Sequence, residues 1–254
     1  EVAAATQHAP STPEKAHANN YPPLADSCDT TAANIILNRR SAQRFDARFT
    51  MPAADFYHML DSLLARSRAP WDVWRYPPRI HPVLFVHRVE GLAPGLYALP
   101  RHAEAQALLR AAMNSEFLWE RVENCPAHLP LFLLLPGAWN KAARTLNCHQ
   151  AIASDGCFAL GMLAEFEPVV QAHPWRYRQL HWEAGLLGQV LYLEAEAAGL
   201  RGTGIGCFFD DAFHELLGLR GKHFQSLYHF TVGRALTDER ISTQAPYPSH
   251  PTEK

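Results

Sequence analysis

The stretch HWEAGLLGQVLYLEAEAAGLRGTGIGCFFDD, residues 181–211, decides the fold, because it contains the most strongly periodic segment of the chain. Apolar and small residues recur every three or four positions over residues 177–198, which is the spacing of a helix with one buried face. Gly199 follows as a C-terminal cap. Small residues such as Ala184 and Gly185 would let another helix or backbone approach closely. We therefore predict a long helix here.

Directly behind this helix, glycines stand at alternate positions, Gly202, Gly204 and Gly206. Glycine lets the main chain adopt unusual conformations and approach another body closely. Three explanations follow from the residues alone, namely a tight turn, a buried crossing, or a flat ligand lying against the backbone amides. The pair Phe208 and Phe209 after the glycines predicts the start of a strand.

The remaining segments predict a mixture of helices and strands. Two β-rich runs, residues 83–89 and 95–99, flank a Gly/Pro connection and predict a hairpin. Further helices are predicted over residues 31–38, 104–110 and 212–219. Another starts at Thr50 with Pro52 in its first turn, and a buried helix is predicted in residues 148–167. Further strands are predicted over residues 129–135 and 226–233. Hairpin-like neighbours argue against a fully parallel sheet, so the predicted fold class is α+β.

Composition limits both the domain organisation and the partners. The 254-residue chain is 48% hydrophobic, and its net charge of −2 gives no broad field for nucleic acid or an anionic membrane. Residues 1–30 lack apolar periodicity and read as a linker or tail, residues 31–245 as the domain, and 246–254 as a second tail. Apolar runs too short to span a bilayer and the lack of an opening leader pattern predict a soluble, cytoplasmic protein. The missing initiator Met suggests processing or excision from a longer chain.

Cysteines and histidines give no recognised metal or disulfide pattern. The five cysteines are widely scattered, and reduced thiols are the simpler expectation. The 14 histidines lack the spacing of known zinc motifs, so no metal is predicted and a metal hydrolase has little support. Cys207, beside two phenylalanines, reads as a small buried residue rather than a redox thiol.

Several segments, in order over roughly residues 31–240, together resemble the nitroreductase-like flavin oxidoreductases, most closely the azoline-oxidising SagB/ThcOx-type dehydrogenase branch. They are RRSAQRF at 39–45, the predicted hairpin, the long helix, TGIGCFFDD at 203–211 and LYHFTVGRALTDER at 227–240. The resemblance implies an α+β sandwich with a mixed, mostly antiparallel sheet and a long central dimerisation helix. It also implies FMN at an interface, in a homodimer or in a pseudo-dimer with a fused unit, of which this chain resembles the second.

The resemblance assigns cofactor contacts to the early arginine loop and to the far end of the chain. Arg39 and Ser41 match the element that holds the phosphate and ribityl end, and Arg40 is in line for the pyrimidine or the phosphate. The planar guanidinium suits phosphate oxygens, although an arginine cluster is also typical of a solvated loop. Near the C-terminus, Arg240 is narrowly preferred to Arg234 as a further phosphate contact.

The same resemblance places Ile205, Gly206 and Cys207 in the turn that meets the flavin ring. The amides of Gly206 and Cys207 would donate to N5 or O4 and stabilise charge that appears on the reduced ring. A plain helix-to-strand connection would explain the glycines equally well. Gln189 and Glu183 fall on the interface face of the long helix, where Gln189 could equally be a structural hydrogen-bonding residue.

One region departs from the family pattern. Relatives in the dehydrogenase branch carry a flavin-contacting Ser-Ala-Gly turn before the hairpin, whereas this chain has Pro77, Pro78 and Arg79. Proline removes backbone donors. Either Arg79 or His81 substitutes for the lost contacts, or a fused partner supplies the remainder of the site.

The leading function from the sequence is an FMN-dependent oxidoreductase. It would pass hydride through flavin N5 in ping-pong fashion between a nicotinamide and a small electron-poor acceptor, with no catalytic side chain. The specialised branch would instead oxidise an azoline. The alternative is a degenerate, non-catalytic half that completes a partner unit's fold and flavin site. The acceptor and the choice of NADH or NADPH stay open.

Overall fold

The computed structural model describes residues 1–7, 21–25, 28–244 and 246. Half of the first predicted tail and nearly all of the second therefore lie outside the described residues. Within the first tail, α1 (Val2–Ala5) is a short helix, and Arg178 donates to the Ala3 carbonyl at 2.9 Å and to Thr6 Oγ1 at 2.8 Å. In the described part of the chain, every helix is too short or too polar to cross a membrane.

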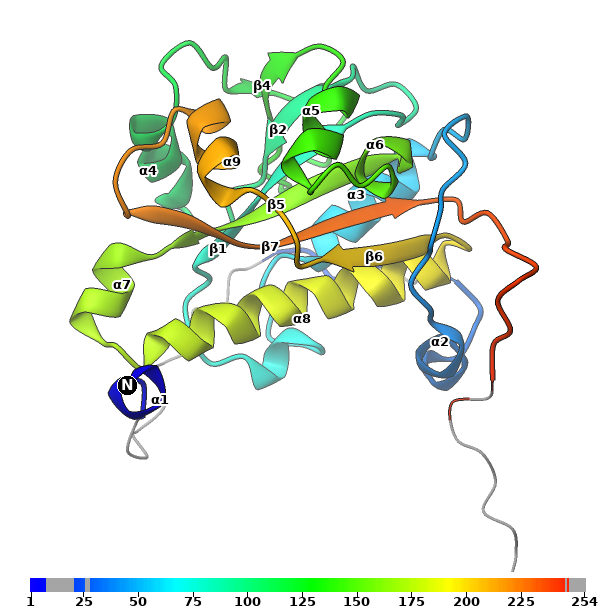
Figure 1. Ribbon diagram of the computed structural model, residues 1–254, viewed down its shortest axis with the longest axis horizontal. Coiled ribbons are helices and arrows are strands. Elements are labelled where there is room, and N and C mark those ends of the chain that lie inside the picture. The colour runs from blue at the N-terminus through cyan, green and yellow to red at the C-terminus, as the bar shows by residue number, and fades with distance from the viewer. Residues whose placement is uncertain (8–20, 26–27, 245, 247–254) are drawn as a thin grey trace, which may run out of the picture.

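A seven-stranded antiparallel sheet forms the centre of the molecule, with helices on both faces (Figure 1). The strand order is β3-β4-β2-β1-β5-β7-β6. The strands are β1 (Ile80–Val86), β2 (Gly95–Ala98), β3 (Glu120–Arg121), β4 (Phe132–Pro136), β5 (Phe158–Glu165), β6 (Arg201–Ile205) and β7 (Phe224–Gly233). The β1–β2 hairpin is as predicted. The layered α+β fold confirms the predicted fold class.

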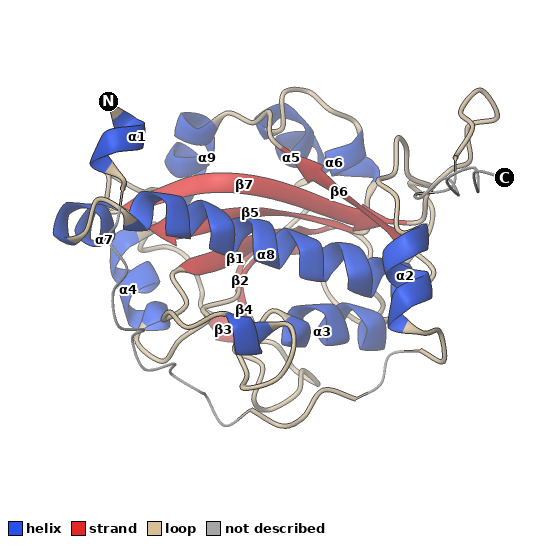
Figure 2. Ribbon diagram, turned by 90° about the horizontal axis from the view of Figure 1, so that it is seen from below, coloured by secondary structure: helices blue, strands red, loops and turns tan. Residues whose placement is uncertain are grey.

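Helices on the two faces cover separate hydrophobic clusters. The 22-residue α8 (Arg176–Ala197) and α3 (Ala53–Ser62) cover one face, as Figure 2 shows from below. The other face carries α4 (Ala105–Ala112), α5 (Asn140–Leu146), α6 (Ile152–Asp155) and α9 (Asp210–Leu217). The peripheral helices are α2 (Ala32–Asn38), α7 (Glu167–Ala172) and the short 3₁₀ helix η1 (Trp71–Val73).

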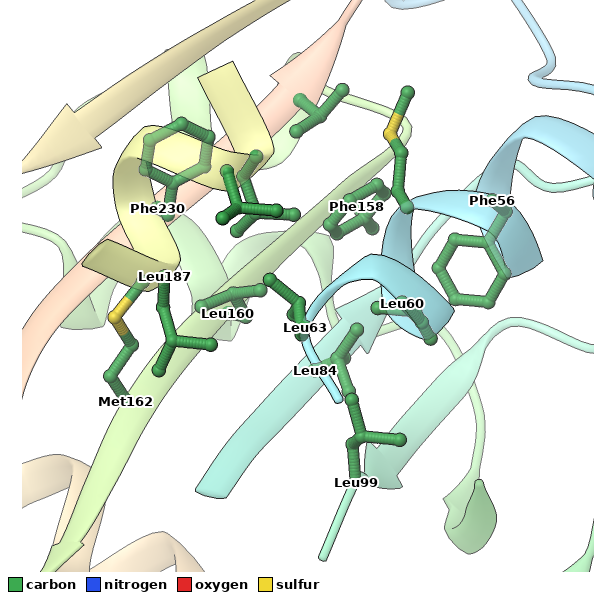
Figure 3. Packing of buried hydrophobic residues seen from close by; sticks show 14 of the residues in the cluster. Phe56, Leu60, Leu63, Leu84, Leu99, Phe158, Leu160, Met162, Leu187 and Phe230 are labelled. Atoms are coloured by element: carbon green, nitrogen blue, oxygen red, sulfur yellow. The ribbon is translucent and has the colours of Figure 1, made fainter. Parts of the chain in front are cut away.

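The cluster under α8 explains why this helix is fixed in place. Leu187 of α8 and Leu60 of α3 are fully buried against Leu160 of β5 and Leu84 of β1 (Figure 3). Burial of each such side chain contributes about 1.5–3 kcal/mol to folding. The predicted helix over residues 177–198 agrees closely with α8.

The predicted buried helix in residues 148–167 is wrong for most of its length. Only the short α6 and the first residue of α7, Glu167, are helical there, and β5 lies between them as a central strand paired with β1 and β7. Every residue of β5 is buried, because helices cover both faces of the sheet. A strand buried on both faces loses the alternation of polar and apolar residues, so its apolar run resembles a buried helix.

Gly202 and Gly204 lie in β6 and not in a turn, which corrects the first of the three explanations for these two positions, whereas Gly206 directly follows the strand. A side chain at Gly202 would meet the Phe230 ring at 2.6 Å, and one at Gly204 would meet the Tyr228 hydroxyl. Side chains two apart share one face of a strand, so both glycines make room for aromatic rings from β7. The predicted strand at Phe208 is also wrong, since this residue lies in the loop after β6.

Candidate functional site

The early arginine loop is joined to β6 and α8 through Tyr192. The Tyr192 hydroxyl lies 2.9 Å from Ser41 Oγ and accepts a hydrogen bond from the Gly204 amide at 2.8 Å. The guanidinium of Arg39 lies over the Tyr192 ring, 4.6 Å from its centroid. Ala42 adds a backbone hydrogen bond to the Gly202 carbonyl at 3.3 Å. Arg39 and Ser41, two of the predicted cofactor contacts, therefore lie beside β6.

Arg39, Arg40 and Arg201 form a positive cluster at the start of β6, which we call the arginine cluster. Partial burial lowers the pKa of Arg201, and the charges of Arg40 and Arg39 lower it further. Glu196 forms an ion pair with Arg201. Arg40 donates to the carbonyls of Leu37 and Arg39 and to that of Gln244 at 3.2 Å. A bound phosphate would offset this concentration of like charge.

Arg201 was not singled out by the sequence analysis. It is about 160 positions from the early loop in the sequence, and the early loop meets the start of β6 through the hydrogen bond from the Ala42 amide to the Gly202 carbonyl. The signal that could have identified Arg201 was its position directly after the long helix, at the start of the segment with alternate glycines.

A groove of about 360 Å³ lies between α8 and β7, next to this cluster. Pockets of this size hold small cofactors. Gln189, one of the predicted contacts, lines the groove, and Tyr192 connects its wall to Ser41. The full lining is His181, Ala184, Gly185, Gly188, Gln189, Tyr192, Leu227 and Tyr228. The exposed Gly185 and Gln189 show that none of the described residues covers this side of α8.

The predicted flavin-contacting turn follows β6, in the part of the chain that we call the elbow, residues 206–209. Ile205 ends β6 and is buried in the second hydrophobic cluster. A side chain at Gly206 would meet no atom within 4 Å, so the backbone there faces open space. The expectation of reduced, buried Cys207 is wrong, because this exposed residue forms a disulfide with Cys148. The two cysteines meet because the elbow passes the end of α5.

The C-terminal arginines, Arg234 and Arg240, contact residues outside the arginine cluster. Arg240 pairs with Asp238 at 2.7 Å, and 84% of its side chain is exposed. The Arg234 guanidinium lies 3.7 Å from the centroid of the Phe49 ring. The structure thus places Arg39, Arg40 and Ser41 beside β6 and Gln189 in the adjoining groove, while Arg240 stays at the surface.

Arg79 and His81 are engaged in a buried polar cluster. Arg79 pairs with Glu165 at 2.5 Å, and His81 Nε2 lies 3.0 Å from the same carboxylate. The Arg79 and Ile80 amides donate to the carboxylate of Glu183 at 3.0–3.3 Å. Glu183 therefore faces inward, whereas the sequence analysis placed it on the interface face of the helix.

A fully buried ion pair joins α8 to the chain segment after β2. Arg101 donates to the Glu183 carboxylate and, at 2.7 Å, to the Leu63 carbonyl. Burial lowers the pKa of Arg101 and raises that of Glu183, and each charge opposes the shift of the other. A buried charge without its partner is costly, so this pair fixes the register of α8 against the sheet.

His81, His102 and Glu165 have the spacing of a metal site, since their ligand atoms lie within 4.8 Å of one another. However, the Arg101 amide donates to His81 Nδ1 at 3.1 Å. In the neutral ring the proton is then on Nε2, the atom that faces Glu165. Metal-binding histidines show the reverse arrangement, with Nδ1–H donating to a second group. The geometry favours a hydrogen-bonded cluster, and the absence of a metal stays a prediction.

Buried histidines predict loss of stability in acid. Burial lowers the pKa of His81 and of His87 to about 4, and that of His229 to about 3. The unfolded chain therefore binds more protons than the folded chain between these values and about 6.5, and stability present above pH 6.5 is lost as pH falls. Each histidine contributes up to about 1.4 kcal/mol per pH unit. Burial lowers the pKa of His102, but its hydrogen bonds to Glu165 and Glu104 outweigh burial and raise the pKa. His102 therefore offsets part of the stability that the buried histidines lose in acid.

Urea denaturation at pH 7 and pH 5 measures this difference. We expect a lower free energy of unfolding at pH 5, and a smaller difference in the variant His229→Phe. His149 is exposed, so His149→Gln should keep the difference of the unmodified chain. Equal stability at the two pH values would show that these histidines are not neutral in the folded protein.

Comparisons with known proteins agree with this architecture. The model of the nitroreductase family matches residues 36–234. A protein from Anabaena variabilis assigned as a nitroreductase is 21% identical, with a TM-score of 0.60 over 80% of this chain and 38% of that chain. One from Ralstonia eutropha is 15% identical, with a TM-score of 0.56 over 91% and 97% of the two chains.

The NADPH:FMN oxidoreductase from Vibrio harveyi complexed with NAD+ is 14% identical, with a TM-score of 0.50 over 87% of this chain and 78% of that chain. At such identities the likenesses concern the fold. The chain spans less than half the length of the Anabaena protein. No curated protein matches the chain. Because the model of the nitroreductase family matches residues 36–234, which are most of the chain, the chain belongs to the nitroreductase family.

Proposed function

We propose that the protein is an FMN-dependent oxidoreductase. The observation that carries the proposal is the continuity from the arginine cluster, through Ser41 and Tyr192, to β6, which Gly206 directly follows. A groove of about 360 Å³ lies alongside this path. An elongated cofactor with a dianionic tail and a flat ring fits that arrangement of charge, groove and open backbone.

The chain's own residues would bind and orient the cofactor. Arg39 and Ser41 would hold the phosphate, with Arg40 and Arg201 adding positive charge. The amides of Gly206 and Cys207 would donate hydrogen bonds to the edge of the ring, which stabilises negative charge there. When bound, the flavin supplies hydride transfer at N5. Gln189 would contact the ring or ribityl chain from the wall of the groove.

We further propose NADH or NADPH as the reductant and a small electron-poor molecule as the acceptor, used in turn at one site. The name of the Vibrio harveyi protein supports a nicotinamide reductant. The SagB/ThcOx-type oxidation of an azoline stays a proposal that rests on the sequence resemblance.

A second unit would complete the site over α8. Trp182 is 59% exposed on this helix, next to the exposed Gly185 and Gln189. Because Gly185 has no side chain, a partner helix could approach this face of α8 closely. The partner would be a second copy or a fused unit, and the greater length of the Anabaena protein is consistent with fusion.

A visible spectrum followed by anaerobic titration tests this function. The purified protein, incubated with FMN and desalted, should retain the absorption bands of oxidised flavin. Addition of NADH or NADPH without oxygen should bleach them, and a nitroaromatic or quinone should restore them. Desalted protein without bound flavin would exclude the proposed function for this chain.

A second candidate function is a non-catalytic half of a tandem protein. Pro77 and Pro78 lack amide donors, and the structure engages Arg79 and His81 with Glu165 instead of leaving them for a ligand. If this candidate holds, Arg39→Ala in the complete tandem protein should leave flavin content and turnover unchanged. Loss of flavin in that variant would support the leading function.

A further inference from the structure

The disulfide between Cys148 and Cys207 lies at the elbow, beside the proposed flavin contact. Cys207 directly follows Gly206, and Cys148 lies just after α5, 59 residues earlier in the chain. Cys207 is exposed and Cys148 partly exposed. A small thiol in solution can therefore reach the bond, since access controls the rate of thiol–disulfide exchange.

Two of the other described cysteines are unsuited to this chemistry. Burial raises the pKa of the Cys125 thiol and of the Cys157 thiol to about 11. At neutral pH both stay protonated, and the thiolate is the reactive form. Cys28 is partly exposed, but the structure gives it no disulfide partner within the described residues.

The backbone on the α5 side of the bond is strained. Cys148 and His149 have φ values of 54° and 60°, the left-handed region that non-glycine residues rarely adopt. Two such residues in succession persist only when the surroundings hold them, and such strain occurs at switch regions. The disulfide is one of the contacts that hold this segment.

Weaker contacts would keep the elbow near its place without the bond. Gln150 Nε2 donates to the Cys207 carbonyl at 3.2 Å, and the Phe209 amide donates to the Leu146 carbonyl at 2.8 Å. The Phe208 ring stacks on His229 with centroids 4.1 Å apart. Reduction is therefore expected to loosen the elbow and not to unfold the domain.

We propose that Cys148 and Cys207 form a thiol–disulfide exchange site for small dithiols, and that its redox state sets the affinity of the elbow for flavin. In the reaction, one donor thiolate attacks a sulfur of the pair and the Cys148–Cys207 bond breaks. The donor's second thiolate then closes the donor's own disulfide. Two electrons and two protons pass to the protein, which gains two thiols. The effect on flavin rests on the proposed function, whereas the exchange reaction does not.

Counting thiols tests the exchange reaction without any flavin. The oxidised protein should give three free thiols per chain after denaturation. Treatment of the folded protein with dithiothreitol, removal of the reagent and denaturation should give five, because both cysteines of the pair are then free. A count that stays at three until the protein is denatured before treatment would overturn the exchange site. So would a count of five in protein exposed to air, which would show that the bond does not form.

FMN titration of the oxidised and reduced protein tests the second part. Reduction should weaken binding roughly five-fold, the loss expected when about 1 kcal/mol of loop ordering must be supplied on binding. Cys148→Ser keeps the Cys207 amide but cannot form the bond, so its affinity should match that of the reduced protein and ignore dithiothreitol. The matched control Cys28→Ser should respond as the unmodified chain does.

The outcomes separate the two proposals. Equal affinity in both redox states overturns the coupling even if the thiol count changes as expected. Absence of FMN binding in both states overturns the proposed function and the coupling together, while the thiol count still decides the exchange reaction. If Cys148→Ser does not fold, the comparison of oxidised and reduced unmodified protein still decides the coupling.

Discussion

Replacement of Arg39 by alanine should weaken FMN binding by roughly 10- to 150-fold. Hydrogen bonds to a charged group contribute about 1.5–3 kcal/mol each, and this range converts to that loss of affinity. The effect should be larger than that of Ser41→Ala, because the hydroxyl carries no charge. The dissociation constant, measured by the change in flavin fluorescence during titration, is the quantity to compare.

Arg48 offers a matched control in the same early loop. Its side chain is 92% exposed and pairs with Asp46. Arg48→Ala should therefore leave the dissociation constant unchanged. Equal losses in the two variants would mean that only the general charge of the loop matters, and no loss in either would place the phosphate elsewhere.

Replacement of Glu183 by glutamine should destabilise the folded protein by about 3–5 kcal/mol. The substitution keeps the shape of the side chain but leaves the Arg101 guanidinium buried without a counter-charge. Breaking one side of a buried pair costs this much, because the remaining charge is neither solvated nor compensated. The free energy of unfolding from urea denaturation measures the effect.

Two controls show whether the unpaired charge is the cause. The double variant Arg101→Met, Glu183→Leu removes both charges and should recover much of the lost stability. Glu215 is exposed on α9, so Glu215→Gln should change stability little. If the double variant were as unstable as Glu183→Gln, lost packing and hydrogen bonds would explain the effect instead.

The sequence predicted those elements whose local pattern survives folding. In α8 one face is buried and the other is open, so the apolar period of a helix remains visible. In β5 helices cover both faces of the sheet, and the pattern that would identify a strand disappears. The sequence left three explanations open for the glycines of β6, because the role of Gly202 and Gly204, to make room for Phe230 and Tyr228, depends on a strand that comes later in the chain.

Some residues of the candidate site could likewise be predicted from the sequence, and others could not. Arg39, Arg40 and Ser41 are consecutive, so their part of the resemblance could be read from this local run of the sequence. The disulfide joins residues 59 positions apart, and the Glu183–Arg101 pair joins residues 82 apart. Such contacts depend on the topology of the sheet, and no spacing in the sequence records them.

A crystal structure of the protein grown with FMN tests the central claim most directly. The account predicts electron density for the cofactor along the groove between α8 and β7, with its phosphate at Arg39 and Ser41 and its ring edge at the amides of Gly206 and Cys207. Density for the phosphate away from the arginine cluster, or a groove that stays empty at saturating FMN, would contradict it.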